Sequence, residues 1–290
     1  MSIPIITVTR PTVGGWRIME NMPEGDTVRQ VADRLDAALA GRRLTRSDLR
    51  VPRLATADLT GRTVLGVTPR GKHLLTRIDG GLTLHSHLRM DGAWQVYGPG
   101  RRWSGGPAHQ IRAILGTAEA TAVGYRLPVL DLLRTADEPR VVGHLGPDLL
   151  GPDWDAPEAR RRLLADPARP LGEALLDQRV MAGVGNVFMA ELCFLTGATP
   201  WLPVGELADP GALVTLAHDL LTANRDRPDR TTTSPGLLAR TGRRLHVYAQ
   251  RGRPCMRCGT PIRVTRETPG HPRPTYWCPH CQHGPPPPRH

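Results

Sequence analysis

The sequence predicts an α+β protein of several domains, with a β-rich N-terminal part that contains one helix, a helical middle and a small cysteine-rich unit at the C-terminus. Three observations support this prediction. An amphipathic helical pattern covers residues 26–41, short alternating apolar runs follow from residue 63, and two C-x2-C pairs stand near the C-terminus. With 290 residues, the chain has room for two domains and an appendage.

The β-rich part begins with the helix predicted over residues 26–41. Its apolar face is formed by Val28, Val31, Ala32, Leu35, Ala38 and Leu39. Gly41 then ends the helix. From residue 63 the apolar period falls toward two, with a hairpin turn at residues 79–81 and a second hairpin over residues 110–127.

Helical spacing marks the middle of the chain, at residues 156–166, 170–180 and 186–195. Gly183 and Gly185 precede Asn186, which we predict as the N-cap of the third helix. Such a turn lets backbone N–H groups approach a phosphate, but it serves the close packing of a helical hairpin equally well. Cys193 lies in an apolar run and is predicted to be a core residue.

The two C-x2-C pairs are Cys255 with Cys258 and Cys278 with Cys281, separated by 19 residues. Each pair can place two thiolates on one tetrahedral zinc ion. Short strands on either side of a turn-rich stretch lie between them, so the pattern predicts a zinc ribbon with one structural zinc ion. Disulfides are the alternative, but a reducing compartment disfavours them.

Positive charge is concentrated near the C-terminus. Residues 225–290 hold thirteen arginines against three acidic residues, which accounts for +10 of the net charge of +11. This distribution indicates a surface for a polyanion, with a solubilising bias as the alternative. The sequence offers no apolar segment long enough to span a membrane, and residues 1–21 do not resemble a secretory signal, so we expect a cytoplasmic protein.

Lysine usage singles out one position. All basic residues but one are arginine, and the exception is Lys72. An ammonium is more compact than a guanidinium and has a different donor geometry. Lys72 is therefore predicted to occupy a site that a guanidinium does not fit, the alternative being a chance survivor of the bias toward arginine.

Six segments stand in a specific order along the chain: MPEGDTV, RGKHLL, HSHLRMDGAW, GPDLL, LLDQRVMAGVGNVFMAE, and the terminal GRPCMRCG with RPTYWCPHCQ. Together they resemble the formamidopyrimidine-DNA glycosylase and endonuclease VIII family. The resemblance runs from Met22 to about Gln282. It implies an N-terminal β-sandwich with one helix, a helix–two-turn–helix domain and a C-terminal zinc ribbon, with DNA bound between the halves.

The resemblance divides the chain as follows: an extension over 1–21 that we expect to be absent from the active form, a catalytic β-sandwich domain over 22–135, a linker over 136–157, a helix–two-turn–helix domain over 158–245, a zinc ribbon over 246–284 and a tail over 285–290. It also implies a bifunctional glycosylase and abasic-site lyase of base excision repair. The expected partner is double-stranded DNA with a damaged base or an abasic site, bound by a monomer without a redox cofactor.

In this family the initiator methionine is removed and the proline after it becomes the N-terminus. The matching residue is Pro23, whose secondary amine is expected to attack C1′ and form a Schiff base. Glu24 is then the expected general acid and base. An internal proline nitrogen is a tertiary amide without an available lone pair, so both roles require that residue 23 comes first.

Other site residues follow from the matching motifs. Lys72 and Asn186 match residues that contact backbone phosphate, and Gly183 and Gly185 form the turn before Asn186. Arg273 matches the ribbon arginine that grips the phosphates beside the extruded nucleotide. A further pair, Arg89 and Met90, matches the loop that fills the gap left in the duplex.

The endonuclease VIII branch is favoured, because MPEGDT is similar to its N-terminal motif. Oxidised pyrimidines and abasic sites are therefore the expected substrates, with β-elimination and then δ-elimination after base removal. An oxidised-purine glycosylase is one alternative. A non-catalytic protein that binds damaged DNA is another, if residue 23 is not the mature N-terminus. A zinc-ribbon transcription factor would explain residues 225–290 but not Lys72 or the MPEGDT motif.

Overall fold

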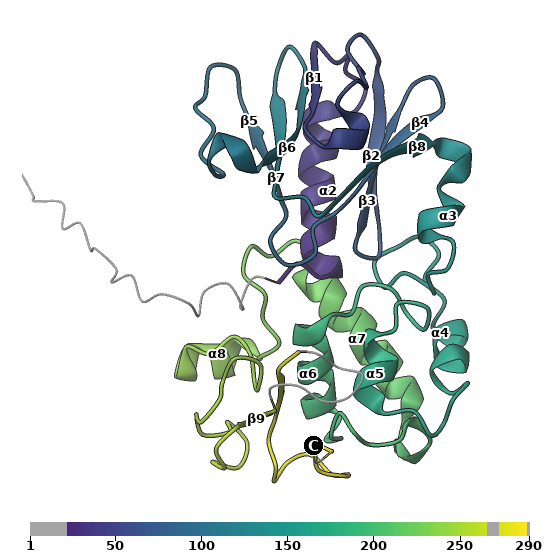
Figure 1. The fold of residues 1–290 in the computed structure, drawn as a ribbon. Coiled ribbons are helices and arrows are strands. Elements are labelled where there is room, and N and C mark those ends of the chain that lie inside the picture. The colour runs from purple at the N-terminus through teal and green to yellow at the C-terminus, as the bar shows by residue number, and fades with distance from the viewer. Residues whose placement is uncertain (1–21, 266–272, 289–290) are drawn as a thin grey trace, which may run out of the picture.

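The computed structural model describes residues 22–265 and 273–288, so the predicted extension over residues 1–21 lies outside the described residues. Figure 1 shows the helices and strands in chain order. They are α2 (Gly25–Leu39), β1 (Arg46–Leu49), β2 (Val64–Arg70), β3 (His73–Ile78), β4 (Leu82–His87), β5 (Ala93–Tyr97), β6 (Ile111–Gly116), β7 (Thr121–Tyr125), β8 (Val129–Arg134), α3 (Pro139–Val142), α4 (Ala156–Leu163), α5 (Leu171–Leu176), α6 (Asn186–Leu195), α7 (Pro210–Asn224), α8 (Pro235–Thr241), β9 (Arg263–Thr265) and β10 (Thr275–Trp277).

The first eight strands form a β-sandwich. One antiparallel sheet has the order β1-β6-β7-β5 and the other β2-β3-β4-β8. Both predicted hairpins are present, since β3 pairs with β4 around residues 79–81 and β6 pairs with β7. Helix α2 stands between the two sheets (Figure 1). This arrangement confirms the predicted sandwich with one helix.

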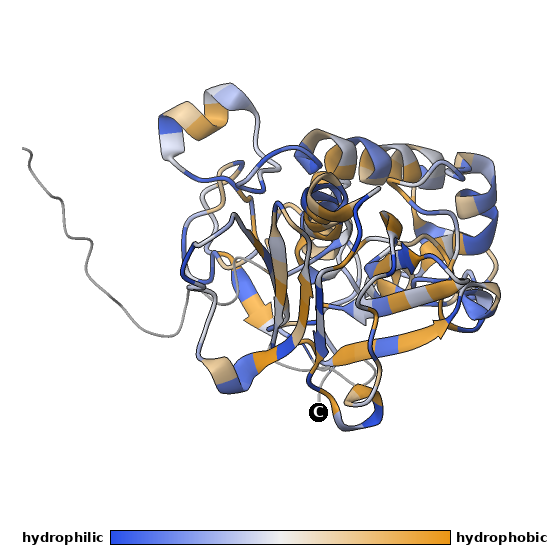
Figure 2. Cartoon of the chain, turned by 90° about the horizontal axis from the view of Figure 1, so that it is seen from above, coloured by the Kyte–Doolittle hydropathy of each residue, from blue (hydrophilic) through white to orange (hydrophobic). Residues whose placement is uncertain are grey.

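The core of the sandwich is built on the apolar face of α2. The predicted face residues are buried, apart from a half-buried Ala38, and they pack with side chains from both sheets. Figure 2 shows hydrophobic and hydrophilic segments alternating along the strands, as expected for strands with one face in a core. Ala40 leaves the helix, and Gly41 follows it with a φ of +73°.

Helices α4 to α7 form the second part, around a separate hydrophobic cluster that includes a fully buried Cys193. The predicted helix over residues 170–180 is too long, because α5 ends at Leu176. Asp177 leaves the helical conformation, and the amide of Gln178 then binds backbone groups of the following turn. Among the described residues, no helix is long and apolar enough to cross a membrane.

A third hydrophobic cluster joins helix α6 to the C-terminal ribbon, in which β9 and β10 pair as predicted. This cluster contains Val187 and Phe194 of α6, Tyr276 of β10 and Met22. Met22 is 3% exposed. The residue before Pro23 therefore lies in the packed junction between the helical part and the ribbon.

Candidate active site

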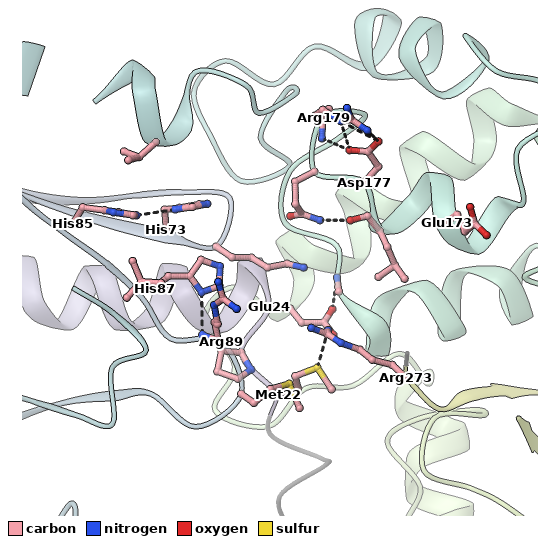
Figure 3. Close-up of a pocket in the computed structure, with 18 of the residues that line it drawn as sticks. Met22, Glu24, His73, His85, His87, Arg89, Glu173, Asp177, Arg179 and Arg273 are labelled. Carbon is pink, nitrogen blue, oxygen red and sulfur yellow. Dashed lines mark hydrogen bonds and ion pairs between the residues drawn. The ribbon is translucent and has the colours of Figure 1, made fainter. Parts of the chain in front are cut away.

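A cavity of about 820 Å³ lies between the sandwich and the helical part (Figure 3). Seven of the residues predicted for the site line it: Pro23, Glu24, Lys72, Arg89, Met90, Gly185 and Arg273. They come from the segment before α2, the β2–β3 turn, the turn after β4, the turn before α6 and the ribbon. The fold thus brings together segments that are far apart in the sequence.

The carboxylate of Glu24 binds the N-terminus of helix α6. Its oxygens accept hydrogen bonds from the backbone N–H groups of Gly185 at 2.8 Å, Val187 at 2.7 Å and Phe188 at 3.2 Å. The predicted N-cap at Asn186 is wrong, because Gly185 occupies the N-cap position and Asn186 is the first helical residue. The carboxylate of Glu24, the residue before α2, satisfies the open N–H groups instead, and the dipole of α6 favours this negative charge.

Two glycines of the turn before α6 allow this close approach. A Cβ at Gly185 would lie 2.4 Å from Cδ of Glu24, and Gly183 has a φ of +118°. The carbonyl of Gly183 accepts a hydrogen bond from the N–H of Gly25 at 2.9 Å. Since the N–H groups of Gly183 and Gly185 are both bonded within the protein, these contacts favour the packing interpretation of the two glycines.

Lys72 reaches the same turn from the β2–β3 connection. Its Nζ donates to the carbonyl oxygen of Val184 at 2.5 Å. The neighbouring Gly71 N–H donates to the carboxylate of Asp148 at 2.6 Å, which fixes the connection. Burial lowers the pKa of Lys72 to about 8, although the negative charge of Glu24 opposes this effect. The ammonium is therefore held at a defined point of the cavity and is easier to deprotonate than an exposed lysine.

Gln178 holds the turn that Lys72 contacts. Its Nε2 donates to the carbonyl oxygens of Leu176 and Val184, each at 2.9 Å, and its Oε1 accepts from the N–H of Gly183 at 3.0 Å. Every hydrogen-bonding position of the amide except one acceptor lone pair is thereby engaged. Gln178 consequently fixes the carbonyl that receives Lys72.

Asn186 and Arg273 lie at the junction with the ribbon. Asn186 donates from Nδ2 to the carbonyl oxygen of Pro274 at 2.9 Å, one residue beyond Arg273. The exposed Arg273 places Nη1 3.6 Å from Sδ of Met22. Figure 3 shows Arg273 and Met22 side by side near Glu24. Asn186 thus helps to position the segment that carries Arg273.

Arg89 and Met90 form an exposed turn after β4. Met90 is 40% exposed, and Arg89 has a φ of +47° with its N–H bonded to Nδ1 of His87. Arg126 supports this turn by donating to the carbonyl oxygen of Asp91 at 3.0 Å. The turn therefore projects two side chains from a braced backbone.

Three histidines form the sandwich wall of the cavity (Figure 3). Nδ1 of His73 lies 2.8 Å from Nε2 of His85, and the rings of His73 and His87 meet edge to face. Burial lowers the pKa of His73 to about 3 and that of His87 to about 4, with the nearby positive charges adding to the effect. This wall is therefore uncharged at neutral pH.

The ribbon cysteines fit one zinc ion. The sulfur atoms of Cys255, Cys258, Cys278 and Cys281 all lie within 4.8 Å of one another. Two of the separations are 3.8 Å, between Cys255 and Cys281, and 3.5 Å, between Cys258 and Cys278. Such spacings suit four thiolates around one tetrahedral zinc, with bonds of about 2.3 Å. The four residues predicted as ligands therefore form the zinc site of the ribbon.

Comparison with known proteins defines the family. The model of the formamidopyrimidine-DNA glycosylase N-terminal domain matches residues 22–126, and the model of the zinc finger found in FPG and IleRS matches residues 252–284. The probable endonuclease 8 2 of Streptomyces coelicolor is 71% identical, over 92% of this chain and 96% of the relative. The chain belongs to the formamidopyrimidine-DNA glycosylase and endonuclease VIII family.

Other members of the family extend this relation. The DNA-(apurinic or apyrimidinic site) lyase Nei2 of Mycolicibacterium smegmatis is 51% identical, over 90% of this chain and 99% of its own length. Endonuclease 8 of Escherichia coli is 34% identical, over 90% and 100%. The solved complex between Lactococcus lactis Fpg and abasic-site DNA has a TM-score of 0.74 at 24% identity, covering 90% of this chain and 100% of that chain. The last comparison shows that the family fold is shared.

Several residues of the site were not predicted from the sequence. Gln178 lies in the motif LLDQRV and Asp148 in the motif GPDLL, so these two motifs are the sequence features that could have identified them. Arg230 is different, because it lies in none of the six motifs. It nevertheless binds Asp26, close to Pro23, which is the N-terminus expected for this family. Its position depends on a contact between segments 204 residues apart.

Proposed function

We propose that the protein removes oxidised pyrimidines from DNA and cleaves the resulting abasic site, with the secondary amine of Pro23 as nucleophile. The supporting observation is that Pro23, Glu24, Lys72 and Arg273 line one cavity between the two halves of a family member. Membership of the family makes the protein a DNA glycosylase and abasic-site lyase of base excision repair. The choice of pyrimidine over purine lesions is supported by the similarity to relatives named endonuclease 8.

The reaction begins when the lone pair of the Pro23 nitrogen attacks C1′ of the extruded nucleotide. The glycosidic bond breaks, the damaged base leaves with a proton, and opening of the sugar ring gives a Schiff base between Pro23 and C1′. Loss of a proton from C2′ then expels the 3′ phosphate by β-elimination. Loss of a C4′ proton and the 5′ phosphate completes δ-elimination, and water releases the amine.

The surrounding residues have distinct roles in this proposal. Glu24 transfers protons to and from the sugar, and its attachment to helix α6 holds it in one orientation. Lys72 and Arg273 bind the phosphates that flank the extruded nucleotide. Asn186 positions the ribbon segment beside them. The exposed turn with Arg89 and Met90 fills the gap in the duplex.

The chemistry requires that the peptide bond between Met22 and Pro23 is absent from the active form. While this bond is present, the nitrogen of Pro23 is an amide without nucleophilic character. The match to the family model begins at residue 22. We therefore propose an active form that starts at Met22 and loses this methionine, and that acts as a cytoplasmic monomer on double-stranded DNA.

Two proteins test this proposal, one translated from Met1 and one from Met22, each with its N-terminus verified by intact mass. Borohydride added during reaction with abasic DNA should trap an adduct on Pro23 in the shorter protein. The Met1 protein should give no adduct. If the uncleaved Met1 protein traps DNA equally well, Pro23 is not the nucleophile and Lys72 becomes the amine to test. Duplexes with single defined lesions then separate pyrimidine from purine excision.

A further inference from the structure

An arginine of the connection between α7 and α8 contacts the residues at the start of α2. The guanidinium of Arg230 donates to both carboxylate oxygens of Asp26, at 2.7 and 2.5 Å, and to the hydroxyl of Thr27 at 3.1 Å. The side chains of Arg230 and Asp26 are 8% and 2% exposed. The guanidinium also lies over the ring of Phe188, 4.9 Å from its centroid. This is a buried ion pair with a fixed geometry.

Arg230 also contacts the peptide bond that must be absent from the active form. Its Nη1 and Nη2 each lie 3.3 Å from the carbonyl oxygen of Met22. That carbonyl carbon is bonded to the nitrogen of Pro23, so the guanidinium lies within about 6 Å of the proposed nucleophile. Removal of Met22 would take away this acceptor and would leave the two nitrogens close to the new amine.

The backbone around Arg230 is held by its neighbours. The side chain of Asn224, at the end of α7, accepts from the N–H of Thr231 at 2.7 Å and donates to its carbonyl oxygen at 2.9 Å. Thr232 donates to the buried carboxylate of Glu191. Arg230 is therefore positioned independently of its contact with Met22, and it keeps its place when Met22 is removed.

On the basis of the proposed function, we propose that Arg230, held in place by its ion pair with Asp26, is a positioning residue that keeps the N-terminal amine of Pro23 in its neutral, nucleophilic form. A guanidinium carries no acceptor, so an ammonium at Pro23 would face N–H groups and a positive charge. The neutral amine offers its lone pair to the same N–H groups. Like charge at this distance disfavours the protonated form.

The other charged and titratable groups around this amine are Glu24 before α2, Asp26 of α2, Lys72 of the β2–β3 turn, Tyr248, and Arg273 of the ribbon. The two carboxylates that could stabilise an ammonium are already engaged, Glu24 by the N–H groups of α6 and Asp26 by Arg230. Lys72 and Arg273 add positive charge, and the positive end of the α2 dipole points the same way.

The pKa of the amine can be measured directly, because the chain has a single lysine. Reductive methylation with 13C-formaldehyde labels two amines in the protein that begins at Pro23, namely Pro23 and Lys72. Their methyl resonances are then followed against pH in the unmodified sequence and in variants. A peptide of residues 23–30 labelled in the same way gives the reference value.

Two substitutions should shift this pKa in opposite directions. Arg230→Gln removes the positive charge and should raise the pKa of the Pro23 amine by about one unit, whereas Asp26→Asn removes the negative charge and should lower it. The acid limb of borohydride trapping on abasic DNA should shift with the pKa. Arg244→Gln is the matched control, because Arg244, which follows α8, pairs on the surface with Asp229 of the same connection. It should leave both measurements unchanged.

Equal amine pKa values in all variants, or shifts of the same sign in both, would overturn the inference. If Pro23 still traps abasic DNA in that case, the proposed function stands without it. Breaking a buried ion pair destabilises a fold strongly, so circular dichroism must show that each variant is folded. If neither variant is folded, the amine pKa of the unsubstituted protein tests the inference. Its amine pKa should lie at least about one unit below that of the peptide, and a value at or above the peptide's refutes the inference.

Discussion

Glu24 packs so closely against Gly185 that no side chain fits at position 185, since a Cβ there would lie 2.4 Å from Cδ of Glu24. We expect Gly185→Ala to displace the Glu24 carboxylate from helix α6, to destabilise the protein by about 1–3 kcal/mol and to abolish base excision. Urea unfolding and a single-turnover excision assay measure the two effects. Gly236→Ala is the control, because nothing lies within 4 Å of its Cβ position. Equal behaviour of the two variants would contradict the packing argument.

Glu24→Gln should remove base excision while the protein remains folded. The amide retains one acceptor for the N–H groups of α6, but it cannot take part in proton transfer at neutral pH. Glu191→Gln provides a matched comparison, because Glu191 accepts three backbone N–H groups from residues 246–248 and does not line the cavity. Both variants should lose similar stability in thermal unfolding. Base excision should be retained by the Glu191 variant and lost by the Glu24 variant.

The pH dependence of DNA binding should show the deprotonation of Lys72. Burial lowers its pKa from 10.5 to about 8. Between these values the unfolded chain binds more protons than the folded one, so the free energy of unfolding from this group should rise with pH. Over the same range Lys72 loses the charge that attracts phosphate, so DNA affinity should fall. Fluorescence anisotropy and denaturation at pH 7–10 measure both trends, and Lys72→Met should remove this component from each.

The salt dependence of DNA affinity should show whether Arg273 contacts a phosphate. Each neutralised phosphate releases counterions, so Arg273→Ala should flatten the plot of log affinity against log salt by about one unit. The loss should be similar for every lesion, since phosphate contacts carry no base information. Arg50→Ala is the control, because Arg50 pairs with Asp48 at β1 and does not line the cavity. An unchanged slope for Arg273→Ala would show that this side chain does not touch phosphate.

Zinc should be required for DNA binding through the position of Arg273. We expect Cys258→Ser to bind well under one zinc per chain and to weaken DNA binding, because the segment with Arg273 is anchored between α6 and the ribbon. Metal analysis and anisotropy test this. Cys193→Ala, which alters a cysteine buried in α6, should retain its zinc. Normal DNA binding by a zinc-free Cys258 variant would contradict the prediction.

The main elements of the fold could be predicted because their signals are local. The apolar face of α2, the hairpins and the C-x2-C pairs each repeat a pattern within a few residues, and the structure contains all of them. The helix over residues 170–180 was predicted too long, because its end is set by Gln178, which bonds to a turn five residues later. Apolar spacing carries no information about that bond.

The site was predictable only where a motif names its residue. The place of Asn186 after two glycines predicts an N-cap, but the N-terminus of α6 is satisfied by Glu24, 161 residues away from Gly185. Arg230 has no local signal, since its partner Asp26 lies in α2. Contacts of this kind depend on how distant segments pack, which a single sequence does not reveal.

The zinc ribbon makes the protein sensitive to oxidants. Among its four cysteines, Cys258 is exposed while Cys255 and Cys278 are buried. Thiolates are oxidised in order of accessibility, and an oxidised cysteine no longer holds zinc. Oxidation would therefore release zinc from the ribbon and weaken DNA binding, while the buried carboxylate of Glu24 stays chemically unchanged. DNA binding would then depend on the redox state of the ribbon thiols as well as on the amount of protein.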